Sequence, residues 1–161
     1  MRKIVVFASL LAAPGVTAIE PCLLADNPAF NQDPRQIRIK KFFERNGCPL
    51  SKLSADFVHE ADANDLDWRL LPSITFVESS GGKYYQNNNV FGWNSCRTRF
   101  KSVRAGLHLV ASTLGNSTLY RDKDTEDILR TYNSSPEYVG RVTSIMRILG
   151  SRPKSALMVL N

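Results

Sequence analysis

Helix start and stop signals punctuate this sequence and limit the architectures that the chain can adopt. The pairs Asp33-Pro34 and Ser135-Pro136 each precede an apolar stretch, and a glycine follows each stretch. Asp and Ser side chains accept hydrogen bonds from the free amides of a first helical turn, and proline is tolerated best at the first helical position. We therefore predict a helix after each pair.

Apolar residues recur at helical spacing through most of the remaining sequence, and no strand pattern or internal repeat is convincing. The segment 67–78 is apolar on most sides, which predicts a buried central helix with Pro72 in its first turn. The predicted helices cover 34–46, 50–64, 67–78, 103–114, 124–132 and 136–149. The expected fold class is all-α.

The segment 83–99 has a different character. It is polar and rich in asparagine, it contains Tyr84, Tyr85, Phe91 and Trp93, and it has no helical period. We predict an ordered loop, with room for a short hairpin, that lines a groove.

The N-terminus has the pattern of a secretory signal peptide. Arg2 and Lys3 precede an apolar run over 4–13, and small residues follow up to Ala18. The run is about half as long as a bilayer crossing requires, although a retained N-terminal anchor is the alternative. We expect cleavage after residue 18, a periplasmic or secreted monomer without stable membrane insertion, a leader over 19–33, one domain over 34–150 and a flexible tail over 151–161.

The formal net charge of the chain is +6, and 43% of its residues are apolar, which excludes a disordered chain. A basic protein suits an anionic partner, and export favours surface polymers. The cluster Arg97, Arg99, Lys101 and Arg104 lacks the interleaved aromatics of a single-strand nucleic-acid surface, and it could also be a solvated face. We expect no nucleic-acid partner.

The three cysteines allow one disulfide in an oxidising compartment. We predict the pair Cys48 and Cys96 from position only, which leaves Cys22 unassigned. With two histidines, His59 and His108, and no paired Cys/His spacing, we expect no metal and no cofactor.

Glu78 is the first candidate for chemistry. It ends the predicted central helix after four residues that are largely apolar. The helix dipole and the apolar surroundings both disfavour a carboxylate there, so we predict a raised pKa. A general acid for a glycosidic oxygen needs this property, whereas the alternative is a glutamate that ends a helix and points to water.

Glu78 belongs to a longer pattern. The pattern consists of Glu78-Ser79-Ser80-Gly81, Asn88-Asn89-Val90-Phe91-Gly92-Trp93, Thr131-Tyr132-Asn133 and Pro136-Glu137-Tyr138-Val139. In order and spacing it resembles the glucosaminidase branch of the lysozyme-like superfamily, which are peptidoglycan-cleaving glycosidases, over roughly 57–149. The resemblance implies a lysozyme-like helical domain whose central helix ends in the catalytic glutamate.

The resemblance also implies roles for single residues. Glu78 would be the catalytic acid, and Tyr132 would face it. The expected substrate-binding residues are Ser79, Asn89, Phe91, Gly92, Trp93, Asn133 and Tyr138. Aromatic faces suit the C–H face of a sugar ring, and amides can pair with hydroxyl and acetamido groups. Phe91 and Tyr138 could instead pack in the core.

One feature departs from a standard glycosidase, which holds two carboxyl groups about 5–9.5 Å apart. No Asp or Glu lies between Glu78 and Trp93. We therefore expect one-carboxylate chemistry, in which the substrate's N-acetyl group, its C6 hydroxyl or a water attacks the sugar. The expected function is an exported endo-β-N-acetylglucosaminidase that acts on peptidoglycan. The alternatives are a lytic transglycosylase, a non-catalytic cell-wall-binding module and a cationic antimicrobial protein.

Overall fold

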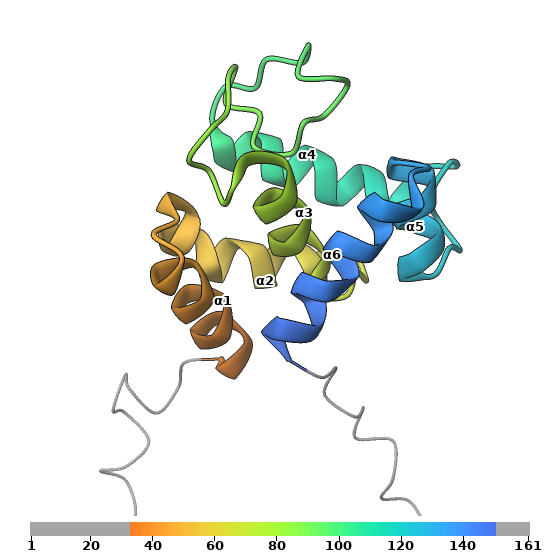
Figure 1. Ribbon diagram of the computed structural model, residues 1–161. Coiled ribbons are helices and arrows are strands. Elements are labelled where there is room, and N and C mark those ends of the chain that lie inside the picture. The colour runs from red at the N-terminus through yellow and green to blue at the C-terminus, as the bar shows by residue number, and fades with distance from the viewer. Residues whose placement is uncertain (1–32, 151–161) are drawn as a thin grey trace, which may run out of the picture. The chain divides into compact units, whose positions relative to one another are not determined.

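The computed structural model describes residues 33–150, and within them it is helical (Figure 1). The helices are α1 (Pro34–Arg45), the 3-10 helix η1 (Pro49–Leu53), α2 (Ser54–Ala63), α3 (Leu70–Ser79), α4 (Val103–Asn116), α5 (Thr125–Tyr132) and α6 (Pro136–Leu149). Between residues 33 and 150 there is no strand, and the predicted hairpin is reduced to a single bridge between Gln86 and Asn89. The all-α prediction is confirmed. The predicted signal peptide, leader and tail lie outside the described residues, except for Asp33.

The predicted capping residues open the helices. Asp33 accepts a hydrogen bond from the backbone N–H of Arg35 at 2.8 Å, and Ser135 begins α6 in the same way. Asp67 accepts in the same way from the N–H of Arg69 at 3.0 Å, but the two residues after it form a turn before the helix begins. The central helix therefore begins at Leu70 rather than at residue 67, and its Pro72 lies in the first turn as predicted.

Two other boundaries differ from the prediction. The segment 50–64 is divided, because its first residues form the tighter η1 turn before α2 begins. α4 continues through Gly115 to Asn116. The prediction takes Gly115 as a helix end, but it lies inside the helix, where its missing side chain lets the backbone of Asn64 approach closely.

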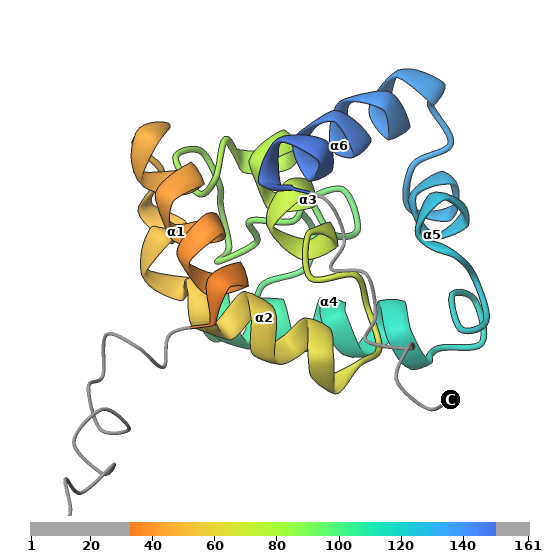
Figure 2. The same ribbon diagram turned by 90° about the horizontal axis from the view of Figure 1, so that it is seen from below.

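The core is built around α3, which lies between α6 and the pair α2 and α4 (Figure 2). Leu70, Leu71 and Ile74 are completely buried on this helix. Each buried side chain of this size stabilises the fold by about 1.5–3 kcal/mol. The prediction of a buried central helix is confirmed.

The end of α3 determines where Glu78 lies. Ser80 adopts a left-handed conformation with φ 51°, and the N–H of Gly81 bonds back to the carbonyl of Thr75 at 3.1 Å. A Cβ atom on Gly81 would lie 2.6 Å from Cys48 Sγ. A glycine is therefore needed for this turn, which leaves Glu78 on the last helical turn.

The predicted disulfide between Cys48 and Cys96 is absent, and both are free thiols. Cys48 is buried beneath Gly81, where its thiol interacts with the carbonyl of Ser80. Cys96 lies in the loop that follows Trp93 and acts electrostatically on Tyr132. The two thiols therefore belong to different parts of the fold, which position along the sequence did not reveal.

Within residues 33–150, no helix is both long enough and apolar enough to cross a membrane.

Candidate active site

A pocket of about 570 Å³ opens beside the end of α3. Glu78 lies in its wall, together with Trp93 and Asn94 from the loop after α3 and Tyr132 and Asn133 from the end of α5. Its volume falls in the range of sites that hold small ligands or part of a polymer. Residues about 50 positions apart in the sequence thus meet at one carboxyl group.

Glu78 and Gly92 touch. Gly92 has a φ of 65°, and a Cβ atom placed on it would come within 3.0 Å of the Glu78 carboxyl carbon and closer still to one carboxyl oxygen. Glycine adopts this left-handed conformation without steric cost. The missing side chain therefore provides the space that the Glu78 carboxyl group occupies.

The pKa of Glu78 is raised above its ordinary value, as predicted. Partial burial is the main cause, because the neighbouring protein reduces the solvation of the charged form while another part of the residue stays exposed to water. The Tyr138 hydroxyl and the positive charge of Arg141 act in the opposite direction and lower the pKa. The protonated form of Glu78 therefore persists to a higher pH than that of a solvent-exposed glutamate.

Two stacked tyrosines lie near the carboxyl group of Glu78. The rings of Tyr132 and Tyr138 stack at 6.1 Å with an interplanar angle of 8°. The Tyr132 hydroxyl donates to the backbone carbonyl of Phe91 at 2.5 Å. Tyr132 thus fastens the end of α5 to the loop, and its proton is directed away from Glu78.

The Tyr138 hydroxyl is buried and has no hydrogen-bond partner of regular geometry among the described residues. It nevertheless lies close enough to Glu78 that each group shifts the pKa of the other, and both burial and Glu78 raise the pKa of Tyr138. Tyr132 already donates its hydroxyl proton to Phe91, so Tyr138 is the tyrosine whose hydroxyl can donate a hydrogen bond to Glu78.

Asn89 organises the loop rather than lining the pocket. Its side chain is buried, it accepts from the N–H of Trp93 at 2.9 Å, and it donates to the carbonyls of Trp93 and Thr98 at 2.9 and 3.3 Å. Asn88 likewise donates to the carbonyl of Phe100 at 2.9 Å. These amides are occupied by the backbone, which corrects the predicted contact of Asn89 with substrate.

Two further residues of the predicted substrate-binding set lie away from the pocket wall. The Phe91 ring is fully buried in the core. Ser79 donates its hydroxyl hydrogen to the carbonyl of Thr75 at 2.8 Å and accepts from the N–H of Gly82 at 3.1 Å, so it completes the end of α3. The structure brings together Glu78, Gly92, Trp93, Tyr132 and Asn133 in the wall, with Tyr138 directly behind them.

Several wall residues were not predicted. Ser95, Thr98 and Tyr120 also line the pocket. Small polar residues in a loop carry no specific signal, and Tyr120 lies in a short turn segment far from any motif. Arg141 could have been found, because it lies three residues after Tyr138 on a helix and so shares its face.

Glu78 is the single carboxylate in the wall of this pocket among residues 33–150. Asp124, an acidic residue that follows α4 in the sequence, accepts a hydrogen bond from the N–H of Asp127 at 2.8 Å and caps α5. The described residues contain no cluster of His, Cys, Asp or Glu that could hold a metal ion.

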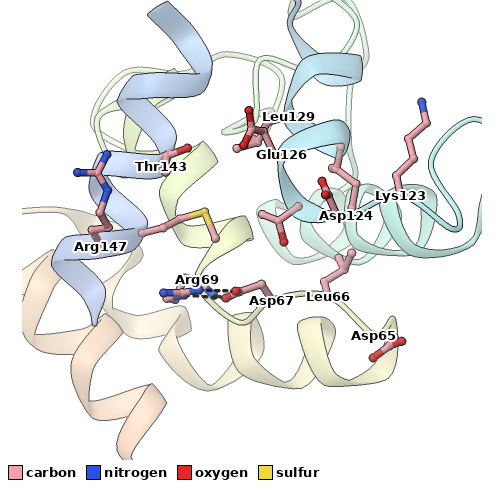
Figure 3. Close-up of a pocket in the computed structure, with 13 residues that line it drawn as sticks. Asp65, Leu66, Asp67, Arg69, Lys123, Asp124, Glu126, Leu129, Thr143 and Arg147 are labelled. Atoms are coloured by element: carbon pink, nitrogen blue, oxygen red, sulfur yellow. Dashed lines mark hydrogen bonds and ion pairs between the residues drawn. The ribbon is translucent and has the colours of Figure 1, made fainter. Parts of the chain in front are cut away.

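A separate pocket of about 510 Å³ lies between α5, α6 and the segment before α3 (Figure 3). Its most buried charged groups are already paired: Arg69 binds Asp67 through two hydrogen bonds at 2.6 and 2.9 Å and donates to the carbonyl of Gly150 at 2.8 Å. The hydrogen bond from Arg69 to Gly150 ties the start of α3 to the end of α6. We therefore place the candidate active site at Glu78.

Comparisons with protein-family models, with curated proteins and with solved structures find no match to this chain.

Proposed function

We propose that this protein is an exported glycosidase that cleaves the β-1,4-linked amino-sugar backbone of peptidoglycan, with Glu78 as the general acid. The observation that carries the proposal is a single carboxyl group of raised pKa in the wall of a pocket that also presents aromatic and amide side chains. The resemblance over residues 57–149 supports the same reaction class. The pocket suits a neutral sugar chain because its other wall residues carry no charge.

In the first step, Glu78 donates its proton to the glycosidic oxygen as the bond from that oxygen to C1 breaks. The carbonyl oxygen of the substrate's own C2 acetamido group forms a new bond to C1 on the opposite face. Glu78 leaves this step as a carboxylate, and it then takes a proton from the water that opens the cyclic intermediate. The buried Tyr138 hydroxyl can donate to the carboxylate between these steps.

Side chains of the wall supply recognition. Trp93 is half-buried and its ring packs against Tyr132 at 5.6 Å, so it offers a fixed apolar face to a pyranose ring. Asn94 and Asn133 are exposed at the pocket and can pair with hydroxyl and acetamido groups. Neither role requires a cofactor.

A lytic transglycosylase is the second candidate. It is favoured by the absence of another carboxylate from the wall within residues 33–150, because the substrate's C6 hydroxyl would then supply the attacking oxygen and give its proton to the Glu78 carboxylate. The product would carry a 1,6-anhydro end. A wall-binding module that retains the pocket but has no turnover is the remaining alternative.

Mass spectrometry of digested, purified cell wall tests the proposal. We expect fragments with a reducing amino sugar from the native chain and none from Glu78→Gln, with Glu126→Gln as the matched control. Glu126 is exposed on α5 and pairs with Arg130, so its loss should leave product release intact. Fragments with 1,6-anhydro ends would support the transglycosylase. Undiminished release of glycan fragments by Glu78→Gln would refute both the glycosidase and the lytic transglycosylase.

A further inference from the structure

Exposed cations without an ionic partner gather along α1 and α6. They are Arg38, Lys41, Arg45, Arg141 and Arg147, and none forms an ion pair within residues 33–150. Arg104 and Arg130, on other parts of the surface, each bind a carboxylate. Other exposed cations also lack an ion pair, but the five on α1 and α6 share one further property, which is that they line cavities.

These cations line two adjoining cavities. One, of about 500 Å³, lies between α1 and the end of α6, and the other, of about 730 Å³, lies between α3 and α6. The rings of Phe42 in the first and Phe76 in the second pack at 4.9 Å, and residues at the end of α6 line both, so the two cavities are neighbours. We call this surface the basic groove. Its apolar floor includes Val77 and Ile145, and Ile148 is 65% exposed.

The basic groove begins beside the candidate catalytic residue. Arg141, which lines the second cavity, lies close enough to influence the Glu78 carboxyl group. A polymer bound at Glu78 would therefore have Arg141, which lines the basic groove, within electrostatic reach. From Arg141 to Ile148 the helix rises about 10 Å, enough for a short peptide of a few residues.

We propose that the basic groove binds the peptide stems of peptidoglycan, an inference that rests on the proposed glycosidase. Peptide stems present free carboxylates, which guanidinium groups bind through paired hydrogen bonds, and alanine methyl groups, which an apolar floor can cover. Glu137 is the single carboxylate lining either cavity among the described residues. An anionic bilayer is disfavoured because the surface is hollowed rather than flat or convex.

Titration of a synthetic, glycan-free wall tetrapeptide into the ¹⁵N-labelled protein tests the inference. We expect amide shifts along α1, α3 and α6, and a dissociation constant that rises with salt. Removing one exposed charge should weaken binding about threefold, so Arg147→Gln and Lys41→Gln should each show this loss and together about tenfold. Lys101→Gln is the matched control, since Lys101 is exposed, forms no ion pair among the described residues and lies outside the basic groove. Amidation of the peptide carboxylates should abolish the shifts.

Several results would overturn the inference. They are equal affinity of the variants and the native protein, shifts confined to the Glu78 pocket, retention of phosphatidylglycerol vesicles without peptide binding, or self-association that the same substitutions abolish. Because the peptide has no glycosidic bond, its binding is independent of catalysis. A chain that binds the peptide but releases no glycan fragments would refute the glycosidase, whereas a chain that cleaves cell wall equally well with both cations replaced would refute the groove.

Discussion

The carboxyl group of Glu78 lies against Gly92, so closely that a Cβ atom at position 92 would displace it. Glu78 ends α3, and Gly92 belongs to the loop that returns over it. The loop therefore covers part of the carboxyl group and contributes to the burial that raises its pKa. One contact between a helix and a loop links the shape of the pocket to its acidity.

Replacing this glycine tests the contact directly. Gly92→Ala should lower the free energy of unfolding by about 1–2 kcal/mol from the left-handed backbone alone, and it should displace the Glu78 carboxyl group and abolish wall digestion. Gly140→Ala is the control, because Gly140 lies inside α6 with no atom near its missing Cβ. We expect it to raise that free energy by about 0.5–1 kcal/mol. Denaturant unfolding of both variants measures the difference, and equal effects would refute the contact.

The raised pKa of Glu78 predicts how stability depends on pH. The folded chain binds the Glu78 proton more tightly than the unfolded chain does, so this group destabilises the fold as pH rises from the ordinary carboxyl value of about 4.5 through the folded pKa. Glutamine does not titrate, so Glu78→Gln should remove this pH-dependent decrease in the free energy of unfolding. Thermal unfolding should therefore show the variant gaining melting temperature relative to the native protein at pH 7 but not at pH 4. A constant difference across this range would contradict the prediction.

The two stacked tyrosines should behave differently when their hydroxyl groups are removed. Tyr138→Phe should raise the pKa of Glu78 further, and it should cost little stability because the hydroxyl has no regular partner. Tyr132→Phe should leave the Glu78 pKa unchanged but cost about 1 kcal/mol, since it leaves the Phe91 carbonyl unpaired. Carboxyl ¹³C titration and denaturant unfolding measure the two quantities. An unchanged Glu78 pKa in Tyr138→Phe would show that Tyr138 only packs.

The two free thiols should differ in reactivity. Cys48 is buried and burial raises its pKa, whereas Cys96 is partly exposed. Iodoacetamide should therefore label Cys96 in the native protein and Cys48 only after unfolding. Peptide mass spectrometry reads both sites. Recovery of a peptide that joins Cys48 to Cys96 from non-reduced protein would contradict the structure.

The sequence was informative about the helices because their ends are locally encoded. Asp33, Ser102, Asp124 and Ser135 each accept a hydrogen bond from an amide of the turn that follows, which is a property of a few adjacent residues. Gly115 was misleading for the opposite reason: its close neighbour, Asn64, is distant in sequence. Boundaries that depend on such contacts cannot be found from a local pattern.

The candidate acid of the site could be predicted from the sequence, whereas the residues of the pocket wall could be predicted only in part. Glu78 was identified from its place at the end of an apolar helix, and the structure confirms its raised pKa. Asn89 and Phe91 were assigned to substrate because amides and aromatic rings can bind sugars. Whether such groups face a ligand or their own backbone depends on the loop path, and here Asn89 bonds to the loop while Phe91 enters the core.

The hydrogen bonds within this loop have a thermodynamic consequence for any ligand. Asn87, Asn88 and Asn89 donate to backbone carbonyls from Trp93 to Phe100, so the pocket wall is held in place by the protein itself. Residues that are already ordered lose little conformational entropy when a ligand arrives. Association at Glu78 should then proceed without a slow rearrangement step, as if the receptor had been assembled in advance.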